Sequence, residues 1–291
     1  MDKLTGILTK EYMSKLDALS YHMTARLTAG YGGARRAKGK GGSLEFADFR
    51  AYADGDDLRR IDWKGYARFD KLFVKLFTEE KQATFNLFLD TSASMAFGEG
   101  EKGLYAKTLA ASLGYIFLRN TDRVNLFAID TALSLTRGGL ASKARFYELA
   151  DALEKLPFGR ETALTAALSQ SREHRLGSGV SFVFSDFFSP DAYEEGALTL
   201  ARKGQQVTLV CLLTPAEVTP EMDGALRLVD AETRQVRDVR VTSEVLSQYQ
   251  QALEAHTERL RAFCAKHGFA YIFANTSTHP LETVGAILRG E

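Results

Sequence analysis

The sequence predicts an α/β protein with a doubly wound, mainly parallel sheet and an N-terminal helical and extended appendage. From residue 84 onward, short apolar runs alternate with segments of helical length, which is typical of strands joined by crossover helices. The runs are bounded and rich in large apolar side chains, as buried strands are. Asp90 and Asp186 stand at the ends of two of them, at the sheet edge where ligands bind. We expect the appendage over residues 1–80 and the sheet domain over residues 81–291.

Composition narrows the classes of function. Basic and acidic residues both number 37, so no net charge favours nucleic acid or an anionic membrane as partner. Cys211 and Cys264 stand in apolar contexts without CxxC spacing, which indicates core residues in a reducing compartment. No uncharged apolar run approaches the ~18 residues of a spanning helix, and no signal-peptide pattern opens the chain. We therefore expect a cytoplasmic protein without membrane insertion.

One apolar stripe runs along residues 3–29, with spacings of three or four residues, and predicts an amphipathic helix. The stripe comprises Leu4, Leu8, Tyr12, Leu16, Leu19, Met23 and Leu27. Packing on its own domain is the simpler interpretation, and docking of a partner or a second copy is the alternative.

A basic, glycine-rich stretch follows, from Arg26 to Lys40, with no acidic residue between Ala18 and Leu44. It is not a phosphate-binding P-loop, because Lys40 is followed by Gly41 rather than Ser or Thr. A mobile loop is the default interpretation, and contact with an anion or acidic partner is the alternative. No nucleic-acid reading motif is present.

Residues 45–80 alternate Arg and Asp around Trp63, the only tryptophan. Asp56 or Asp57 would cap a short helix that reaches about Arg68. An alternating pattern over residues 71–77 predicts an edge strand. The charges predict a salt-bridge network in this segment, with Trp63 buried against the next domain.

The sheet domain can be assigned element by element. Buried strands are expected at residues 84–90, 123–130, 179–187, 205–213 and 269–275, with an edge strand at 132–137 and a hairpin over 224–241. Helices are expected at residues 102–119, 142–156, 162–174, 191–203 and 243–267, and from Pro280 onward.

Oxygen-bearing side chains gather at the ends of these strands. Asp90, Ser92 and Ser94 follow the first strand at spacings of two, so their oxygens can converge on one point. Together they supply half of the octahedral oxygen shell that Mg²⁺ requires. Asp186 ends another strand at the same edge, and Thr162 follows a glycine loop between them. Thr165 is the alternative to Thr162.

This order of residues resembles the metal-ion-dependent adhesion site of von Willebrand factor A domains. The resemblance implies Asp90, Ser92, Ser94, Thr162 and Asp186 as ligands of Mg²⁺, or of Mn²⁺ or Ca²⁺, directly or through water. An Asp-x-Ser-x-Ser segment alone could be a strand-to-helix turn with a serine cap. The added Thr and Asp, in the right order, make coincidence an unsatisfactory explanation.

The upstream block resembles the signature of the domain-of-unknown-function family fifty-eight, a bacterial and archaeal family that joins such a segment to a von Willebrand A-like domain. The matching residues are Arg50, Tyr52, Gly55, Asp56, Asp57, Arg59, Ile61, Asp62, Trp63, Ala67 and Arg68. The resemblance covers roughly residues 40 to 290. This family is commonly paired with MoxR-type AAA+ ATPases, which implies such a partner.

Three candidate functions are compatible with these residues. Hydroxyl ligands leave a metal ion electrophilic, which favours a non-enzymatic adaptor whose metal ion receives an Asp or Glu of a protein partner. By resemblance, that partner is a MoxR-type ATPase or its client, and the process is chaperone-like maturation or assembly. The alternative, a Mg²⁺-dependent hydrolase, needs a nucleophile or general base, and a haloacid-dehalogenase-type phosphatase would want Asp where Ser92 stands. Nucleic-acid binding through the basic loop is the third possibility, and the neutral charge weighs against it.

Overall fold

The chain forms two compact units, which are described separately. The computed structural model describes residues 3–30, 44–79, 82–98, 100–159, 161–174, 176, 178–189, 191–231 and 235–290. The larger unit comprises Met1–Ala34 and Ala83–Glu291, and the smaller one Arg35–Gln82. The boundary between Gln82 and Ala83 lies near the predicted one, but the N-terminal helices, predicted as part of the appendage, fall in the larger unit. The N-terminal helices belong to the larger unit because Leu4, Tyr12 and Leu16 are buried in its core.

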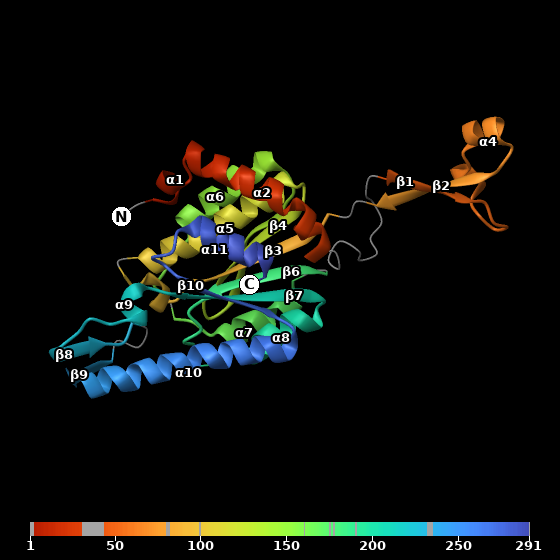
Figure 1. The fold of residues 1–291 in the computed structure, drawn as a ribbon. Coiled ribbons are helices and arrows are strands. Elements are labelled where there is room, and N and C mark those ends of the chain that lie inside the picture. Colours follow the sequence, from red (N-terminus) through yellow and green to blue (C-terminus); the bar gives the residue numbers. More distant parts are fainter. Residues whose placement is uncertain are drawn as a thin grey trace. The chain divides into compact units, whose positions relative to one another are not determined.

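A six-stranded sheet forms the centre of the larger unit, in the order β10-β7-β6-β3-β4-β5 (Figure 1). Its strands are β3 (Thr84–Asp90), β4 (Arg123–Ile129), β5 (Leu133–Leu140), β6 (Gly179–Ser185), β7 (Gln205–Leu213) and β10 (Ala270–Asn275). Only β5 is antiparallel to its neighbour. The chain winds outward from β3 to β5 and returns to β6 on the other side of β3. The topological switch point, where open α/β sheets bind ligands, therefore lies between β3 and β6.

Helices cover both faces of this sheet (Figure 1). One layer contains α1 (Leu4–Ile7), α2 (Lys10–Gly30), α5 (Glu101–Arg119), α6 (Phe146–Lys155) and α11 (Pro280–Arg289), and the other contains α7 (Leu164–Ser169), α8 (Glu194–Arg202) and α10 (Ser243–His267). Each layer packs on its own apolar core: Phe85 and Leu87 of β3 point into the first, and Phe88 into the second. Residues of β3 thus enter opposite cores, which is why its sequence carries large apolar side chains on both faces. The buried Asn86 between them donates a hydrogen bond to Gln205 and accepts one from Asn125. The predicted doubly wound fold is confirmed.

The N-terminal stripe packs on its own unit, as the simpler interpretation predicted. The helix expected over residues 3–29 is divided into α1 and α2, and the Tyr12 hydroxyl lies 2.8 Å from Ser112 Oγ on α5. The glycine-rich residues 31–43 of the predicted basic loop lie outside the described residues.

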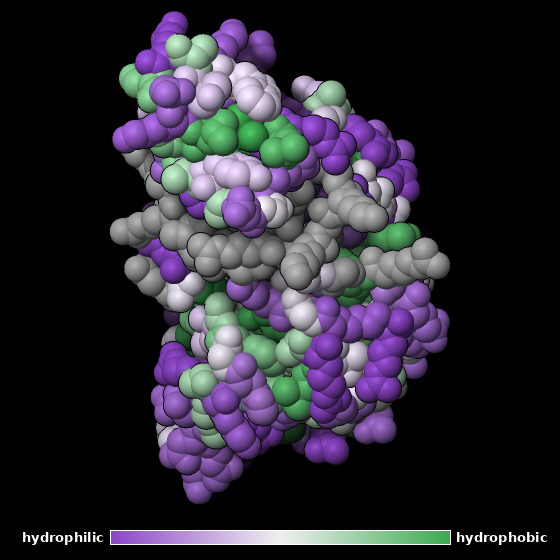
Figure 2. All heavy atoms as spheres, turned by 90° about the vertical axis from the view of Figure 1, so that its right-hand side faces the viewer, coloured by the Kyte–Doolittle hydropathy of each residue, from purple (hydrophilic) through white to green (hydrophobic). Residues whose placement is uncertain are grey.

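The smaller unit pairs β1 (Leu44–Ala51) with β2 (Phe73–Glu79) in an antiparallel hairpin that also carries a 3-10 turn (Leu58–Arg60) and α4 (Trp63–Phe69). Asp57 caps the 3-10 turn, because its side chain accepts a hydrogen bond from Arg59 N. The single helix predicted to reach about Arg68 is divided, and α4 begins separately after Asp62. Arg50 and Asp56 form one of the predicted ion pairs, at 2.7 Å. Trp63 is 60% exposed and contacts Tyr66 edge-on, so its burial against the other unit stays a prediction. Figure 2 shows hydrophobic side chains in patches among hydrophilic ones on one face of the molecule.

The elements after β7 include the predicted hairpin and the predicted long helix. After β7 comes the one-turn helix α9 (Pro215–Val218), then the predicted hairpin of β8 (Gly224–Val229) and β9 (Val236–Val241), which leads into α10. Among the described residues, no helix combines the length and the apolarity needed to cross a membrane.

Candidate metal centre

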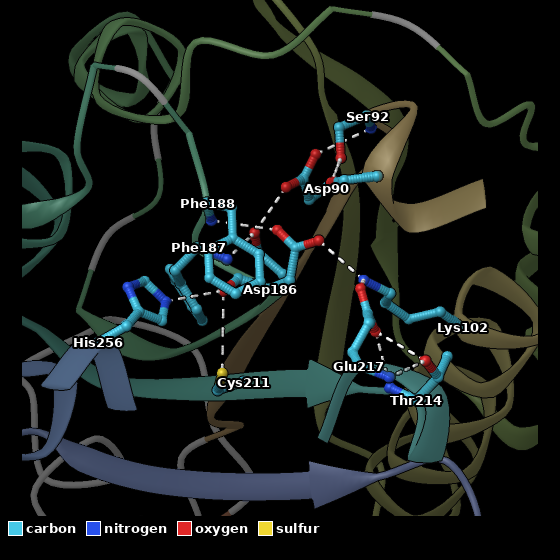
Figure 3. A network of polar contacts seen from close by, with 12 residues as sticks. Asp90, Ser92, Lys102, Asp186, Phe187, Phe188, Cys211, Thr214, Glu217 and His256 are labelled. Carbon is cyan, nitrogen blue, oxygen red and sulfur yellow. Dashed lines mark hydrogen bonds and ion pairs between the residues drawn. The ribbon is translucent and has the colours of Figure 1, made fainter. Parts of the chain in front are cut away.

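Three neighbouring strands deliver carboxylates to one edge of the sheet (Figure 3). Asp90 is the last residue of β3, Asp186 directly follows β6, and Glu217 lies in α9 just after β7. The strands are parallel and adjacent in the order β7-β6-β3, so their carboxyl ends meet at the same edge. The structure therefore brings the two predicted carboxylates together and adds a third.

Asp90 is buried, 1% exposed, and both of its oxygens accept hydrogen bonds. Ser92 N donates to Oδ1 at 2.9 Å, and Ser185 Oγ donates to Oδ2 at 2.6 Å. Burial, and then the charge of Asp186, raise the pKa of Asp90 to about 7, against the opposing hydrogen bonds from Ser185 and Ser92. A cation at this edge would oppose that rise, because a positive charge favours the ionised carboxylate.

Two serine hydroxyls stand next to Asp90. Ser92 Oγ lies 3.0 Å from Ser94 Oγ. Gly159 N donates to the carbonyl oxygens of Thr91 (3.1 Å) and Ser92 (3.3 Å), so the loop that leads to Thr162 is held against this turn. Gly159 has φ +108°, a backbone conformation that side-chain-bearing residues rarely adopt. The glycine thus permits the approach of the loop.

The two candidate threonines share one unusual property. The hydroxyls of Thr162 and Thr165 are buried and have no hydrogen-bond partner among the described residues. A buried polar group without a partner costs about 1–3 kcal/mol. The helix predicted from residue 162 begins at Leu164, so Thr162 lies in the loop and Thr165 in the first turn of α7. Both alternatives therefore remain.

The residues present fit a hard divalent cation bound largely through hydroxyls. All the expected donors are oxygens: the carboxylates of Asp90 and Asp186, the Ser92–Ser94 pair and an unpartnered threonine. No group of three or more His, Cys, Asp or Glu side chains that could hold a metal occurs in the described part of the chain. Mg²⁺ requires few protein carboxylates because it retains several waters.

Substitution of the two threonines separates their roles. Thr162→Val is expected to weaken Mg²⁺ affinity by about tenfold or more, because valine keeps the shape but removes an oxygen near the ion. Thr165→Val is the matched control and should leave the affinity unchanged. Isothermal titration calorimetry with MgCl₂ measures both. The reverse pattern would assign the position to Thr165, and equal affinities in all three proteins would contradict a threonine ligand.

Sequence reasoning missed a buried cation at this edge. Lys102, in the first turn of α5, is fully buried, and its Nζ donates to Asp186 Oδ2 at 2.9 Å and to Glu217 Oε1 at 2.6 Å. Burial alone would lower the pKa of Lys102, but the attraction of Asp186 and Glu217 outweighs it and raises the pKa. The side chain is therefore a charged ammonium.

Glu217 had a partial signal in the sequence. It forms a capping box in which Thr214 Oγ1 accepts from Glu217 N and Glu217 Oε2 accepts from Thr214 N, at 3.3 and 2.8 Å. The pattern Thr-x-x-Glu at the end of a strand predicts this local turn. It does not predict the contact with Lys102, 115 residues away along the chain.

The backbone after Asp186 is held in a strained conformation. Phe187 has φ +60°, which costs a bulky residue on the order of 1–3 kcal/mol. Phe187 N donates to Ser185 Oγ at 2.9 Å, and Phe188 N donates to Asp186 Oδ1 at 3.1 Å. His256 Nε2 lies 3.2 Å from the Asp186 carbonyl oxygen and its ring stacks on Phe188. The turn thus fixes the direction of the Asp186 carboxylate, and His256 is a second neighbour that the sequence did not reveal.

Comparison with known protein families identifies the family to which the chain belongs. The model of a family described as "Protein of unknown function DUF58" matches residues 48–259. The chain belongs to the DUF58 family. Similar proteins include the uncharacterized protein Rv1480 of Mycobacterium tuberculosis and the uncharacterized protein Mb1516 of Mycobacterium bovis. Each is 26% identical to this DUF58 chain over 74% of its length and 69% of the relative's.

Solved structures with a similar fold come from several bacteria. BatB from Bacteroides thetaiotaomicron is 14% identical, covers 72% of the DUF58 chain and 96% of its own, and has a TM-score of 0.43. A von Willebrand factor type A protein from Catenulispora acidiphila is 12% identical, with coverages of 75% and 43% and a TM-score of 0.41. The family model confirms the predicted family, and the sheet topology confirms the predicted α/β fold class with a mainly parallel sheet.

Proposed function

We propose that this DUF58 protein is a non-enzymatic adaptor that binds a divalent cation, Mg²⁺ or else Mn²⁺ or Ca²⁺, and uses it to receive an Asp or Glu of a protein partner. The observation that carries the proposal is the unpartnered, buried Thr162 hydroxyl, on a loop bonded to the backbone of Ser92. An oxygen that is buried without a partner is explained when a cation or its water occupies the space beside it.

The charges at the sheet edge support docking of a carboxylate. Both oxygens of Asp186 already accept hydrogen bonds, one from Lys102 and one from Phe188 N. Lys102 thus offsets part of the negative charge of Asp186, and the other expected ligands are Asp90 and neutral hydroxyls. An ion with so few anionic ligands keeps most of its positive charge and attracts an incoming carboxylate.

Exposed aromatic side chains beside the centre support a protein as the source of that carboxylate. Phe97 follows the Ser94 turn and is 42% exposed, and Phe188 follows Asp186 and is 45% exposed. The Phe97 ring centre lies 6.0 Å from Lys102 Nζ, and Phe188 stacks on His256. Aromatic residues near a central polar contact are typical of protein interfaces.

The partner class rests on the family. DUF58 membership supports a MoxR-type AAA+ ATPase, or a client that it remodels, as the protein that supplies the carboxylate. The adaptor would then act in the cytoplasm, in chaperone-like maturation or assembly of client proteins.

Removing the aromatic rings tests this proposal. Phe97→Ala and Phe188→Ala are expected to weaken binding of a purified MoxR-type ATPase from the same organism by about tenfold each, while Mg²⁺ affinity is kept. Phe273→Ala is the matched control, since Phe273 is also 42% exposed but lies on β10. Biolayer interferometry in MgCl₂ and in EDTA measures the binding. Binding that survives EDTA and both variants would contradict the adaptor proposal.

A further inference from the structure

Lys102 stands where neither helix stability nor burial favours a lysine. It lies in the first turn of the long helix α5, whose N-terminal end carries a partial positive charge and attracts anions. It is also fully buried, and an unpaired buried ammonium is strongly unfavourable. The two carboxylates that it contacts offset both effects, so its role lies in the contacts with Asp186 and Glu217.

The ammonium lies between carboxylates from two strands. It joins Asp186, after β6, to Glu217, after β7, and the charge of Asp186 also acts on Asp90 of β3. Figure 3 shows Lys102 on one side of Asp186 and Asp90 with Ser92 on the other. Asp186 is therefore shared between a permanent cation and the predicted metal position.

We propose that Lys102 is a tethered counter-ion of the metal centre, which balances Asp186 and Glu217 so that the fold does not depend on a divalent ion and the ion binds weakly enough to exchange. This rests on the metal centre of the proposed function. Among the residues that the structure describes, Lys102 is the cation that pairs with Asp186 and Glu217, so without its ammonium Mg²⁺ would have to balance more of the charge of the three carboxylates. Lys102 acts through Asp186 and is a positioning residue.

Thermal unfolding with and without Mg²⁺ measures this role. In Lys102→Met, the rise in Tm between EDTA and MgCl₂ is expected to exceed that of the wild type by about 3 °C or more, the effect of a tenfold gain in Mg²⁺ affinity in a chain of this size. Lys203→Met is the matched control, because Lys203 Nζ also donates to two oxygens, but those of neutral carbonyls, at 2.8 and 2.9 Å. Its rise should equal that of the wild type.

Glu217→Gln provides the opposite change. It directs the whole ammonium charge at Asp186 and removes one negative charge, so the Mg²⁺-induced rise in Tm should become smaller than in the wild type. This variant decides the question if Lys102→Met does not fold.

The outcomes separate the two proposals. A Mg²⁺-induced rise in Tm that is larger in Lys102→Met than in the wild type supports the tethered counter-ion. If Lys102→Met does not fold, a rise that is smaller in Glu217→Gln than in the wild type supports it. A rise in the wild type that Lys102→Met does not exceed overturns it and leaves the metal centre intact. A response in Lys102→Met alone overturns both, because the ammonium would then replace the ion rather than balance a centre that binds it. No response in either protein overturns both.

Discussion

The metal-free Asp90→Asn variant is expected to be more stable than the wild type at pH 8, by on the order of 3 kcal/mol, and to lose its response to Mg²⁺. The wild-type carboxylate is buried next to Asp186 and is ionised at this pH only at a cost. Asparagine keeps the acceptor for Ser92 N and the contact with Ser185 but carries no charge. Urea unfolding in EDTA and in MgCl₂ measures both effects.

The pH dependence has a definite sign. The pKa of Asp90 is raised from 3.8 to about 7 in the folded protein, so the folded state keeps a proton that the unfolded chain releases. The stability of the metal-free wild type, relative to Asp90→Asn, is therefore highest below 3.8 and is lost as the pH rises through about 7. Mg²⁺ should restore it, because the ion favours the carboxylate.

A second buried aspartate provides the control. Asp122 is 2% exposed and accepts from Ala83 N at the opposite edge of the sheet, where β3 and β4 begin. Asp122→Asn should keep the wild-type response to Mg²⁺. A Mg²⁺ response that persists in Asp90→Asn would show that the ion binds without Asp90.

Gly179→Ala is expected to destabilise the fold by roughly 2–4 kcal/mol, the range of overpacked or disrupted core positions. An added Cβ would lie 2.2 Å from the Thr84 carbonyl oxygen, a backbone atom at the start of β3. Because β6 then could not pair closely with β3, Asp186 would also move away from Asp90. Thermal and urea unfolding measure the loss of stability.

Gly6→Ala is the matched control for this substitution. Gly6 lies exposed in α1, with open space around the position of a Cβ, so alanine should be neutral or slightly stabilising there. A wild-type stability for Gly179→Ala would contradict the close pairing of β3 and β6.

The sheet could be predicted from the sequence because its strands are buried on both faces. The run TFNLFLD sends Phe85 and Phe88 into opposite cores, and such short runs of mainly large apolar residues are visible without a structure. The strand β1 was missed, because its sequence LEFADFRA alternates weakly and depends on pairing with β2. The N-terminal helices were assigned to the appendage because burial of their apolar stripe in the larger unit is a tertiary property.

Only part of the candidate site could be predicted from the sequence. Asp90 and Asp186 could be placed at one edge because parallel strands end together, and the structure brings them together. The buried position of Lys102 could not be predicted, because a lysine near the start of a helix is usually solvent-exposed. Its two acceptors also lie 84 and 115 residues away along the chain. The choice between Thr162 and Thr165 depends on loop geometry, which spacing does not specify.

Crystals soaked in MnCl₂ offer the most direct test of the central claim, that Asp90, Ser92, Ser94, a threonine and Asp186 hold a divalent cation. The account predicts an anomalous difference peak within coordination distance of the Ser92 and Ser94 hydroxyls, on the Asp90 side of Asp186, and no such peak for Asp90→Asn. A wild-type map with no peak at this edge, or a peak that persists in Asp90→Asn, would contradict it.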